Sequence, residues 1–132
     1  MLKAALRHNG LAQVLQAAED VLSMLAVEGI YVDDLALEPG DPAAWRRFVG
    51  GVRGAEVSGA GGIRDPQALE AARKMMKSDM VFRDTALFFQ RRFDAVLTEF
   101  APGASDAELL ALAGTRSGRA FMLLARLSGS FD

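Results

Sequence analysis

The residues best suited to bind a ligand lie in AGTRSGRAFMLLARL, at residues 113–127. Arg116 and Arg119 flank Ser117 at the expected start of an apolar helix. Such a helix start binds anions through its free N–H groups and the macrodipole, which also disfavours unpaired cations. A negative group is therefore expected beside the two arginines. We expect a carboxylate of the protein there, with a bound anion as the alternative, so Arg116, Ser117 and Arg119 are the candidate ligand-binding residues.

The same segment also admits a helix-turn-helix interpretation, with residues 106–125 as the motif and Gly114 in the turn. Leu110 falls where the crossing of two such helices needs a small residue, and Phe121 and Met122 fall where polar groups should face DNA. The net charge of −2 and the pI of about 5.4 do not attract nucleic acid. DNA binding is therefore the third hypothesis, after association and ligand binding.

Few other residues are suited to catalysis. The chain has no cysteine and one histidine, His8, which excludes disulfides, thiolate nucleophiles and cysteine-based zinc sites. The glycine-rich segment GGVRGAEVSGAGG, at residues 50–62, matches neither a Walker A loop nor the dinucleotide-binding pattern. The acidic residues of 31–41 do not follow EF-hand spacing. We therefore predict no catalytic residue, metal site or cofactor. Carboxylates and arginines leave an acid–base enzyme open as an alternative, but no constellation of residues points to one.

The expected elements are helices of one all-α domain spanning 1–132, a bundle of five to six helices. Residues 50–62 are expected to form a mobile loop, because glycine is costly to order and few apolar side chains hold this stretch. Gly29 is the expected stop of the first helix. The expected helix starts are Asn9, Asp41-Pro42, Asp65-Pro66, Ser78-Asp79, the capping box Ser105-Asp106-Ala107-Glu108, and Thr115 or Ser117.

A long helix at about 80–100 is expected at the centre of the bundle. Its apolar residues are spaced alternately four and three apart, a strict period of 3.5. That period favours a core helix, and a coiled-coil seam to a second chain is the alternative. Leu87 and Phe88 lie outside the stripe and need a further apolar neighbour, which is either another helix of the same chain or a partner chain. We predict them as interface residues of a homodimer. The stripe consists of Phe82, Ala86, Phe89, Phe93, Val96 and Phe100.

Charge is divided along the chain. Residues 9–45 contain seven acidic residues and no Lys or Arg, whereas residues 64–92 contain seven basic residues against four acidic ones. These two parts are expected to pack together, within one chain or across a dimer. The candidate partners of the two helix-start arginines are the acidic segment, Asp94, Glu99 and Asp132. No apolar run approaches the ~20 residues of a membrane span, and no signal-peptide pattern is present. We therefore expect a cytoplasmic protein without a membrane partner.

Three segments resemble a group of small, uncharacterised helical proteins of alphaproteobacteria. They are DPAAWRRF (41–48), SDMVFRD (78–84) and SGRAFMLLARL (117–127). The resemblance implies an all-helical cytoplasmic protein and carries no activity. The residues themselves favour a non-catalytic protein that acts through self-association or protein–protein interaction. The alternative is a module that binds a small anionic or amphipathic ligand, through Arg116 and Arg119 or in a pocket lined by Phe and Met.

Overall fold

Most of the helices begin at the residues that the helix-start signals of the sequence predicted. The computed structural model describes the backbone of residues 2–131 and the side chains of residues 10–131, and this part of the chain contains no β-strand. The predicted all-α bundle is confirmed. Its elements are α1 (Leu2–Val27), η1 (Val32–Asp34), α2 (Pro42–Val49), η2 (Ala55–Ala60), α3 (Pro66–Ser78), α4 (Met80–Phe100), η3 (Ala101–Gly103), α5 (Asp106–Ala113) and α6 (Arg116–Leu127), where η marks a 3-10 helix.

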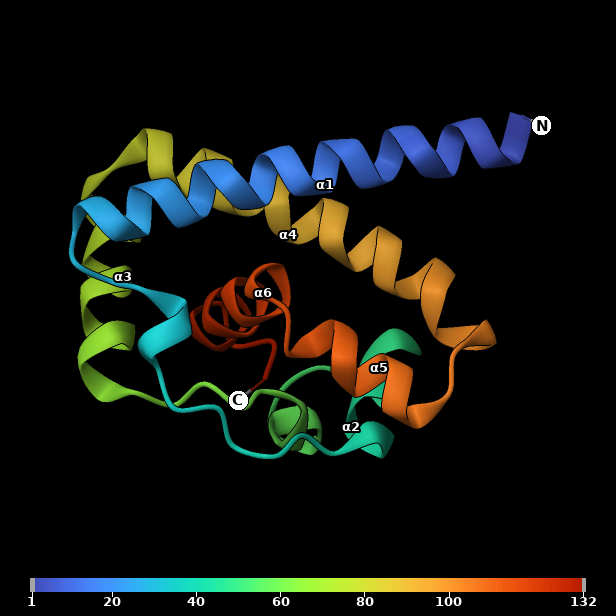
Figure 1. Cartoon of the computed structure of the whole chain (residues 1–132). Coiled ribbons are helices and arrows are strands. Elements are labelled where there is room, and N and C mark those ends of the chain that lie inside the picture. Colours follow the sequence, from blue (N-terminus) through green and yellow to red (C-terminus); the bar gives the residue numbers. More distant parts are fainter. Residues whose placement is uncertain (1, 132) are drawn as a thin grey trace.

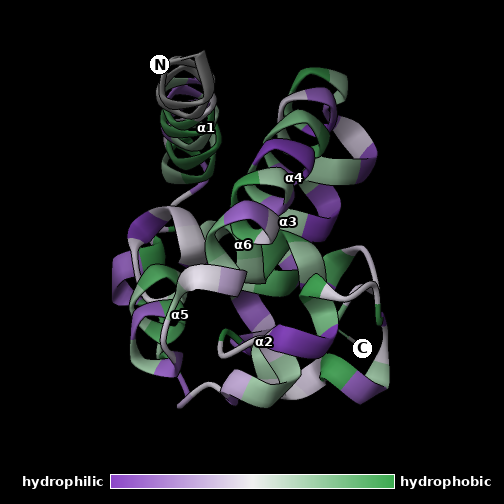
Figure 2. Ribbon diagram, turned by 90° about the vertical axis from the view of Figure 1, so that its right-hand side faces the viewer, coloured by the Kyte–Doolittle hydropathy of each residue, from purple (hydrophilic) through white to green (hydrophobic). Residues whose placement is uncertain are grey.

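The helices surround α6. Figure 1 shows α1 and α4 crossing one side of the molecule, α3 at one end, and α2 and α5 on the opposite side, with α6 between these groups. In Figure 2, apolar segments of several helices meet around α6 at the centre. Helix α4, which was predicted at the centre of the bundle, contacts α1, α2, α3 and α6 and lies on one side of the central α6 (Figure 1). Helix α1, with 26 residues, is nevertheless longer than α4, with 21.

Short polar side chains cap the helices as predicted. The carboxylates of Asp41, Asp65 and Asp79 each accept a hydrogen bond from a backbone N–H in the first turn that follows. Thr115, and not Ser117, caps α6 by accepting from Gly118 N at 3.0 Å. These caps satisfy N–H groups that the helix leaves without an internal partner.

The start of α1 was predicted wrongly and its end correctly. The helix is continuous from Leu2, so Asn9 is not its N-cap. Gly29 has a φ of 80°, and Ile30 N donates back to Leu25 O at 2.9 Å, as in a Schellman motif. The C-terminal end of α1 could therefore be predicted from the sequence, because it depends on one glycine with positive φ.

The buried face of α4 departs from a strict 3.5-residue period in its last turns. Leu97 is 2% exposed and belongs to the core, whereas Val96 is half-buried and Phe100 is 37% exposed. A straight α-helix turns about 20° per heptad relative to a 3.5-residue repeat, so the buried stripe moves from position 96 to position 97. The predicted core positions Phe82, Ala86, Phe89 and Phe93 are all buried.

Helix α6 is buried on nearly every side. All residues from Ala120 to Arg126 are buried, including both Phe121 and Met122. The Phe121 ring stacks on Phe93 with centroids 4.5 Å apart and lies 6.4 Å from Trp45. Residues 120–125 carry only apolar side chains and are buried on every side, as is typical of a core element, which explains the central place of α6.

The glycine-rich segment 50–62 has more buried apolar contacts than the sequence suggested. It contains η2, and Val57 and Ala60 within it are fully buried. Gly54 N donates to Ser130 O at 2.9 Å. The expectation of few apolar contacts was therefore wrong, because the small side chains of Val57 and Ala60 are completely buried. Its mobility stays a prediction.

Candidate functional sites

The helix start at 115–119 holds the first candidate site. Arg116 Nε lies 3.1 Å from Asp33 Oδ2, and both side chains are more than half exposed. Asp33 belongs to η1, in the acidic 9–45 segment that was expected to supply a partner. Among the other candidates, Asp94 pairs with Arg53 instead, and Asp132 lies outside the described residues. The negative group beside Arg116 is thus a carboxylate of the protein.

The three candidate ligand residues do not converge on one point. Arg119 Nε donates to Gly114 O at 3.0 Å, next to the C-terminus of α5, where the helix dipole favours a cation. Ser117 is half-buried between the two arginines. The cleft next to Arg116 has a volume of about 160 Å³ and contains the carboxylates of Glu19 and Asp33. An anion would meet two like charges there, so this geometry gives no support to an anion pocket.

The burial of α6 bears on the helix-turn-helix hypothesis. A recognition helix must present one face to the major groove. Phe121 and Met122, which would lie on that face, are 2% and 1% exposed. Within α6, the exposed residue is Arg116, in the first turn. This arrangement argues against DNA reading by residues 106–125.

Sequence reasoning missed Arg126, which is the buried charged residue of the 10–131 region. Its Nε donates to Ile63 O at 3.1 Å, and its Nη2 donates to Gly61 O at 2.6 Å and Ser58 O at 3.3 Å. A Cβ on Gly61 would lie 2.6 Å from Nη2, so a side chain is excluded there. Arg126 therefore joins α6 to the end of the glycine-rich segment, and its role is structural.

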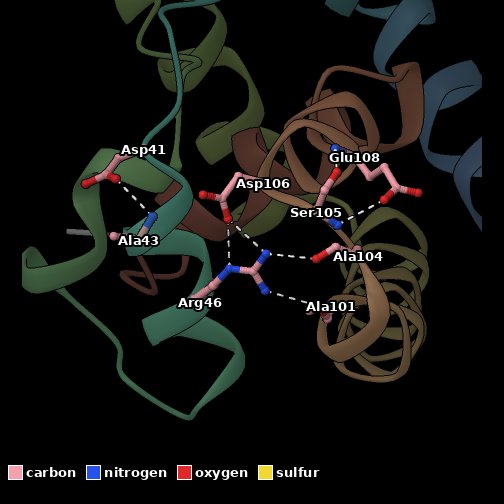
Figure 3. A network of polar contacts seen from close by, with 8 residues as sticks. All are labelled: Asp41, Ala43, Arg46, Ala101, Ala104, Ser105, Asp106 and Glu108. Atoms are coloured by element: carbon pink, nitrogen blue, oxygen red, sulfur yellow. Dashed lines mark hydrogen bonds and ion pairs between the residues drawn. The ribbon is translucent and has the colours of Figure 1, made fainter.

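A second arginine, Arg46, joins α2 to the connection between α4 and α5. Its Nε and Nη2 both contact Asp106 Oδ1, at 3.0 and 2.9 Å. Its remaining contacts are with the carbonyl oxygens of Ala101 and Ala104 (Figure 3). The adjacent capping box of Ser105 and Glu108 completes this polar network. The three guanidinium nitrogens of Arg46 all contact protein groups, so the network positions elements.

The predicted interface residues on α4 are exposed. Phe88 is 45% exposed and Leu87 is 37% exposed. Two further large apolar side chains of the same helix, Met80 and Val81, are 66% and 64% exposed. The guanidinium of Arg92 lies 5.2 Å from the Phe88 ring centroid and covers part of it. These four apolar residues, Met80, Val81, Leu87 and Phe88, are named the α4 outer face below.

A separate apolar cleft lies between α1 and the end of α4. Its volume is about 370 Å³, and its lining includes Leu11 of α1 and Val96 and Phe100 of α4. Leu11 and Leu15 are 48% and 59% exposed. The stretch Gly10–Val27 is long and apolar enough to cross a membrane by length and composition. Core helices of soluble proteins pass the same test, so the cytoplasmic location stays a prediction.

Another cleft lies beside Trp45. Its volume is about 290 Å³, and its lining comes from residues 37–40, α2, η2, α5 and α6. Trp45 is 1% exposed, and its Nε1 is a buried donor without a hydrogen-bond partner among the described residues. Leu110 and Met122 contribute apolar walls. The sequence contained no signal for this cleft, because its walls come from five separate segments.

No catalytic constellation can be assembled from the described residues. No group of three or more His, Asp or Glu side chains there could hold a metal ion. His8 lies outside the residues whose side chains are described. Most acidic side chains with defined contacts cap helices or pair with arginines, as Asp106 and Glu38 do, whereas Asp20 accepts from Gln16 within α1.

No family model, curated protein or solved structure matches the chain. The three segments behind the alphaproteobacterial resemblance supply caps and core positions, such as Asp41, Asp79 and Ala120. The resemblance therefore stays a prediction.

Proposed function

We propose that the protein is a non-catalytic helical protein that acts through self-association, and that two copies meet through the α4 outer face. The observation that carries this proposal is the grouping of four large apolar side chains on one exposed side of one helix. Single exposed apolar residues are common on protein surfaces and need no explanation. A group of four along two turns of α4, with Asp84 between its two pairs, offers a largely apolar surface to a partner.

The spacing of these residues puts them opposite the core. At 100° per residue, positions 80, 81, 87 and 88 fall on the side of α4 away from Phe82, Phe89 and Phe93. The latter three side chains are between 0% and 2% exposed. Helix α4 therefore has a filled inner face and an apolar outer face in the same two turns.

The charges on this outer side favour a second copy as the partner. Asp84 and Arg91 lie on the same side of α4, and neither forms an ion pair within residues 10–131. When two α4 helices pack antiparallel about an axis between Leu87 and Phe88, Asp84 of each copy lies opposite Arg91 of the other. The same axis places Leu87 opposite Phe88. The surface is thus complementary to itself, as a two-fold interface requires.

The expected dimer is weak. One helix-to-helix contact buries less than the ~1,600 Å² of a standard interface. Apolar burial contributes about 25 cal/mol per Å², and the loss of rotational and translational freedom opposes it. A dissociation constant in the micromolar range is therefore expected.

Sedimentation velocity from micromolar to millimolar concentration tests the proposal. The wild-type protein should shift from monomer to dimer as concentration rises. Asp84→Arg and Arg91→Asp should each weaken the dimer at least tenfold, because each change creates two like-charge contacts about the axis. The double variant should recover dimerisation, because both contacts are then reversed. Lys77→Glu on α3 changes the charge as much as Arg91→Asp does and should leave the dimer unchanged.

Two outcomes would contradict the proposal. One is a monomer at every concentration. The other is a dimer that none of the α4 substitutions weakens, which would move the interface elsewhere, with the α1–α4 cleft next to be tested.

A further inference from the structure

The cleft beside Trp45 lacks one interaction that a folded protein normally provides. The Trp45 indole is almost fully buried, and its N–H has no acceptor among residues 10–131. Buried donors in native proteins are almost always paired, with protein groups, water or a ligand. Tryptophan in particular usually finds a partner for its N–H when it is buried.

The backbone next to this donor belongs to a glycine, Gly40, which has no side chain. A Cβ on Gly40 would lie 3.5 Å from Trp45 Nε1 and 3.1 Å from Leu110 Cδ2. Gly40, Trp45 and Leu110 all line the cleft. A side chain at position 40 would therefore crowd both the donor and the Leu110 wall of the cleft. The sulfur of Met122, a possible acceptor in the wall, already accepts from Gly62 N at 3.2 Å.

The charge of the lining limits which ligands fit. Glu38 is the charged residue of the lining, and its Oε2 lies 3.0 Å from Arg64 Nε. No cation lines the cleft, so a negatively charged ligand would find no counter-ion and would lie near a carboxylate. Most of the remaining lining is apolar: Leu37, Pro39, Ala60, Leu110, Ala113 and Met122. Small-molecule sites commonly combine apolar walls of this kind with a few polar groups that orient the ligand.

We propose that this cleft binds a small neutral molecule with an apolar body and one acceptor oxygen, which accepts a hydrogen bond from Trp45 Nε1. The apolar body lies against Leu110 and Met122. The proposal is independent of self-association, because the cleft and the α4 outer face share no residue.

The single tryptophan of the chain makes a direct test possible. The protein labelled with ¹⁵N gives one indole N–H resonance, which reports on Trp45 alone. Cyclohexanone and acetophenone are the probes, and methylenecyclohexane and α-methylstyrene are their isosteres with a carbon in place of the carbonyl oxygen. The ketones should shift the indole proton downfield in a saturable way and slow its exchange with solvent. The isosteres should bind at least tenfold more weakly.

Variants test whether the ketones bind in this cleft and not elsewhere on the protein. Gly40→Ala crowds Nε1 and should weaken ketone binding at least tenfold. Gly103→Ala is the control, because a Cβ at that position meets no atom within 4 Å. If Gly40→Ala does not fold, Leu110→Phe fills the same cleft from the side of α5.

Three results would overturn the proposal. The first is an indole resonance that no ketone shifts, as would be seen if a water molecule held the site. The second is equal binding of ketones and isosteres, which would leave the Trp45 N–H without a role. The third is tighter binding of cyclohexanecarboxylate than of cyclohexanone, which would make the site an anion site.

Discussion

Arg116 at the start of α6 pairs with Asp33 in η1, with Nε and Oδ2 3.1 Å apart. This contact joins the acidic N-terminal third of the chain to a helix start that would otherwise repel its own arginine. It also places a carboxylate where a bound anion was the alternative.

The energetic contribution of this pair should be small. Exposed ion pairs contribute about 0.2–1 kcal/mol, and salt screens them. In a double-mutant cycle of Arg116→Ala and Asp33→Ala, urea unfolding should give a coupling energy of about 0.5 kcal/mol that vanishes at high salt. In a DNA titration at low salt, Arg116→Ala/Arg119→Ala should behave like the wild type. Salt-sensitive DNA binding that only the wild type shows would restore the helix-turn-helix hypothesis.

Arg126→Met should destabilise the protein far more than the loss of the Arg116–Asp33 ion pair. The substitution leaves the carbonyl oxygens of Ser58, Gly61 and Ile63 without this donor inside the fold. The expected loss is about 3 kcal/mol in the free energy of unfolding. Arg73→Met, on the exposed side of α3, is the matched control and should change stability by less than about 0.5 kcal/mol.

Hydrogen exchange tests the role of Arg126 in the glycine-rich segment. The amides of residues 54–63 should be protected in the wild type and exchange rapidly in Arg126→Met. Fast exchange in both proteins, with early proteolysis near Arg53 or Arg64, would instead support the mobile loop expected from the glycine content.

Two glycine substitutions should have opposite effects. A Cβ on Gly118 would overlap the carbonyl oxygens of Leu112 and Ala113, so α5 and α6 would have to separate. Gly118→Ala should therefore cost about 1–3 kcal/mol. Gly10→Ala should stabilise α1 by about 0.5–1 kcal/mol, because its Cβ meets nothing within 4 Å and alanine favours a helix interior. Thermal unfolding of the two variants measures both signs, and a neutral Gly118→Ala would refute the close approach of α5 and α6.

The capping box of α5 predicts a pH dependence. Hydrogen bonds from the backbone N–H of Ser105, and then its side chain, hold the pKa of Glu108 below its usual value of 4.5. A carboxyl group with a lowered pKa stabilises the fold above its unfolded pKa and loses this contribution as pH falls through the folded value. The melting temperature should therefore fall more between pH ~6 and ~3 in the wild type than in Glu108→Gln, which keeps the acceptor oxygen. Glu19→Gln, outside any cap, should follow the wild type.

Much of the fold could be predicted because its signals are local. A cap such as Asp65 or a stop such as Gly29 depends on a few adjacent residues, so these helix boundaries follow from the sequence. The pairing of Arg116 with an acidic residue of 9–45 could also be predicted, since the helix dipole required a negative partner and that segment is rich in acidic residues.

The rest depends on contacts between distant segments. Arg126 is flanked by apolar residues in the sequence, and nothing nearby shows that it meets carbonyl oxygens 63 to 68 residues earlier. The cleft beside Trp45 is likewise assembled from five segments, and its unpaired donor lies beside Gly40, five residues earlier in the chain. Such features follow from tertiary packing, which residue spacing does not encode.

The central place of α6 has a consequence for synthesis on the ribosome. Helices α1 to α5 are translated before α6. Translation proceeds at about 5–20 residues per second, so seconds pass between the synthesis of these helices and the emergence of α6. Helices α1 and α4 can pair during that time, but Trp45 has no Phe121 to pack against and residues 58–63 have no Arg126. The nascent chain therefore exposes an aromatic surface until α6 is made, and this interval is when it most needs a chaperone.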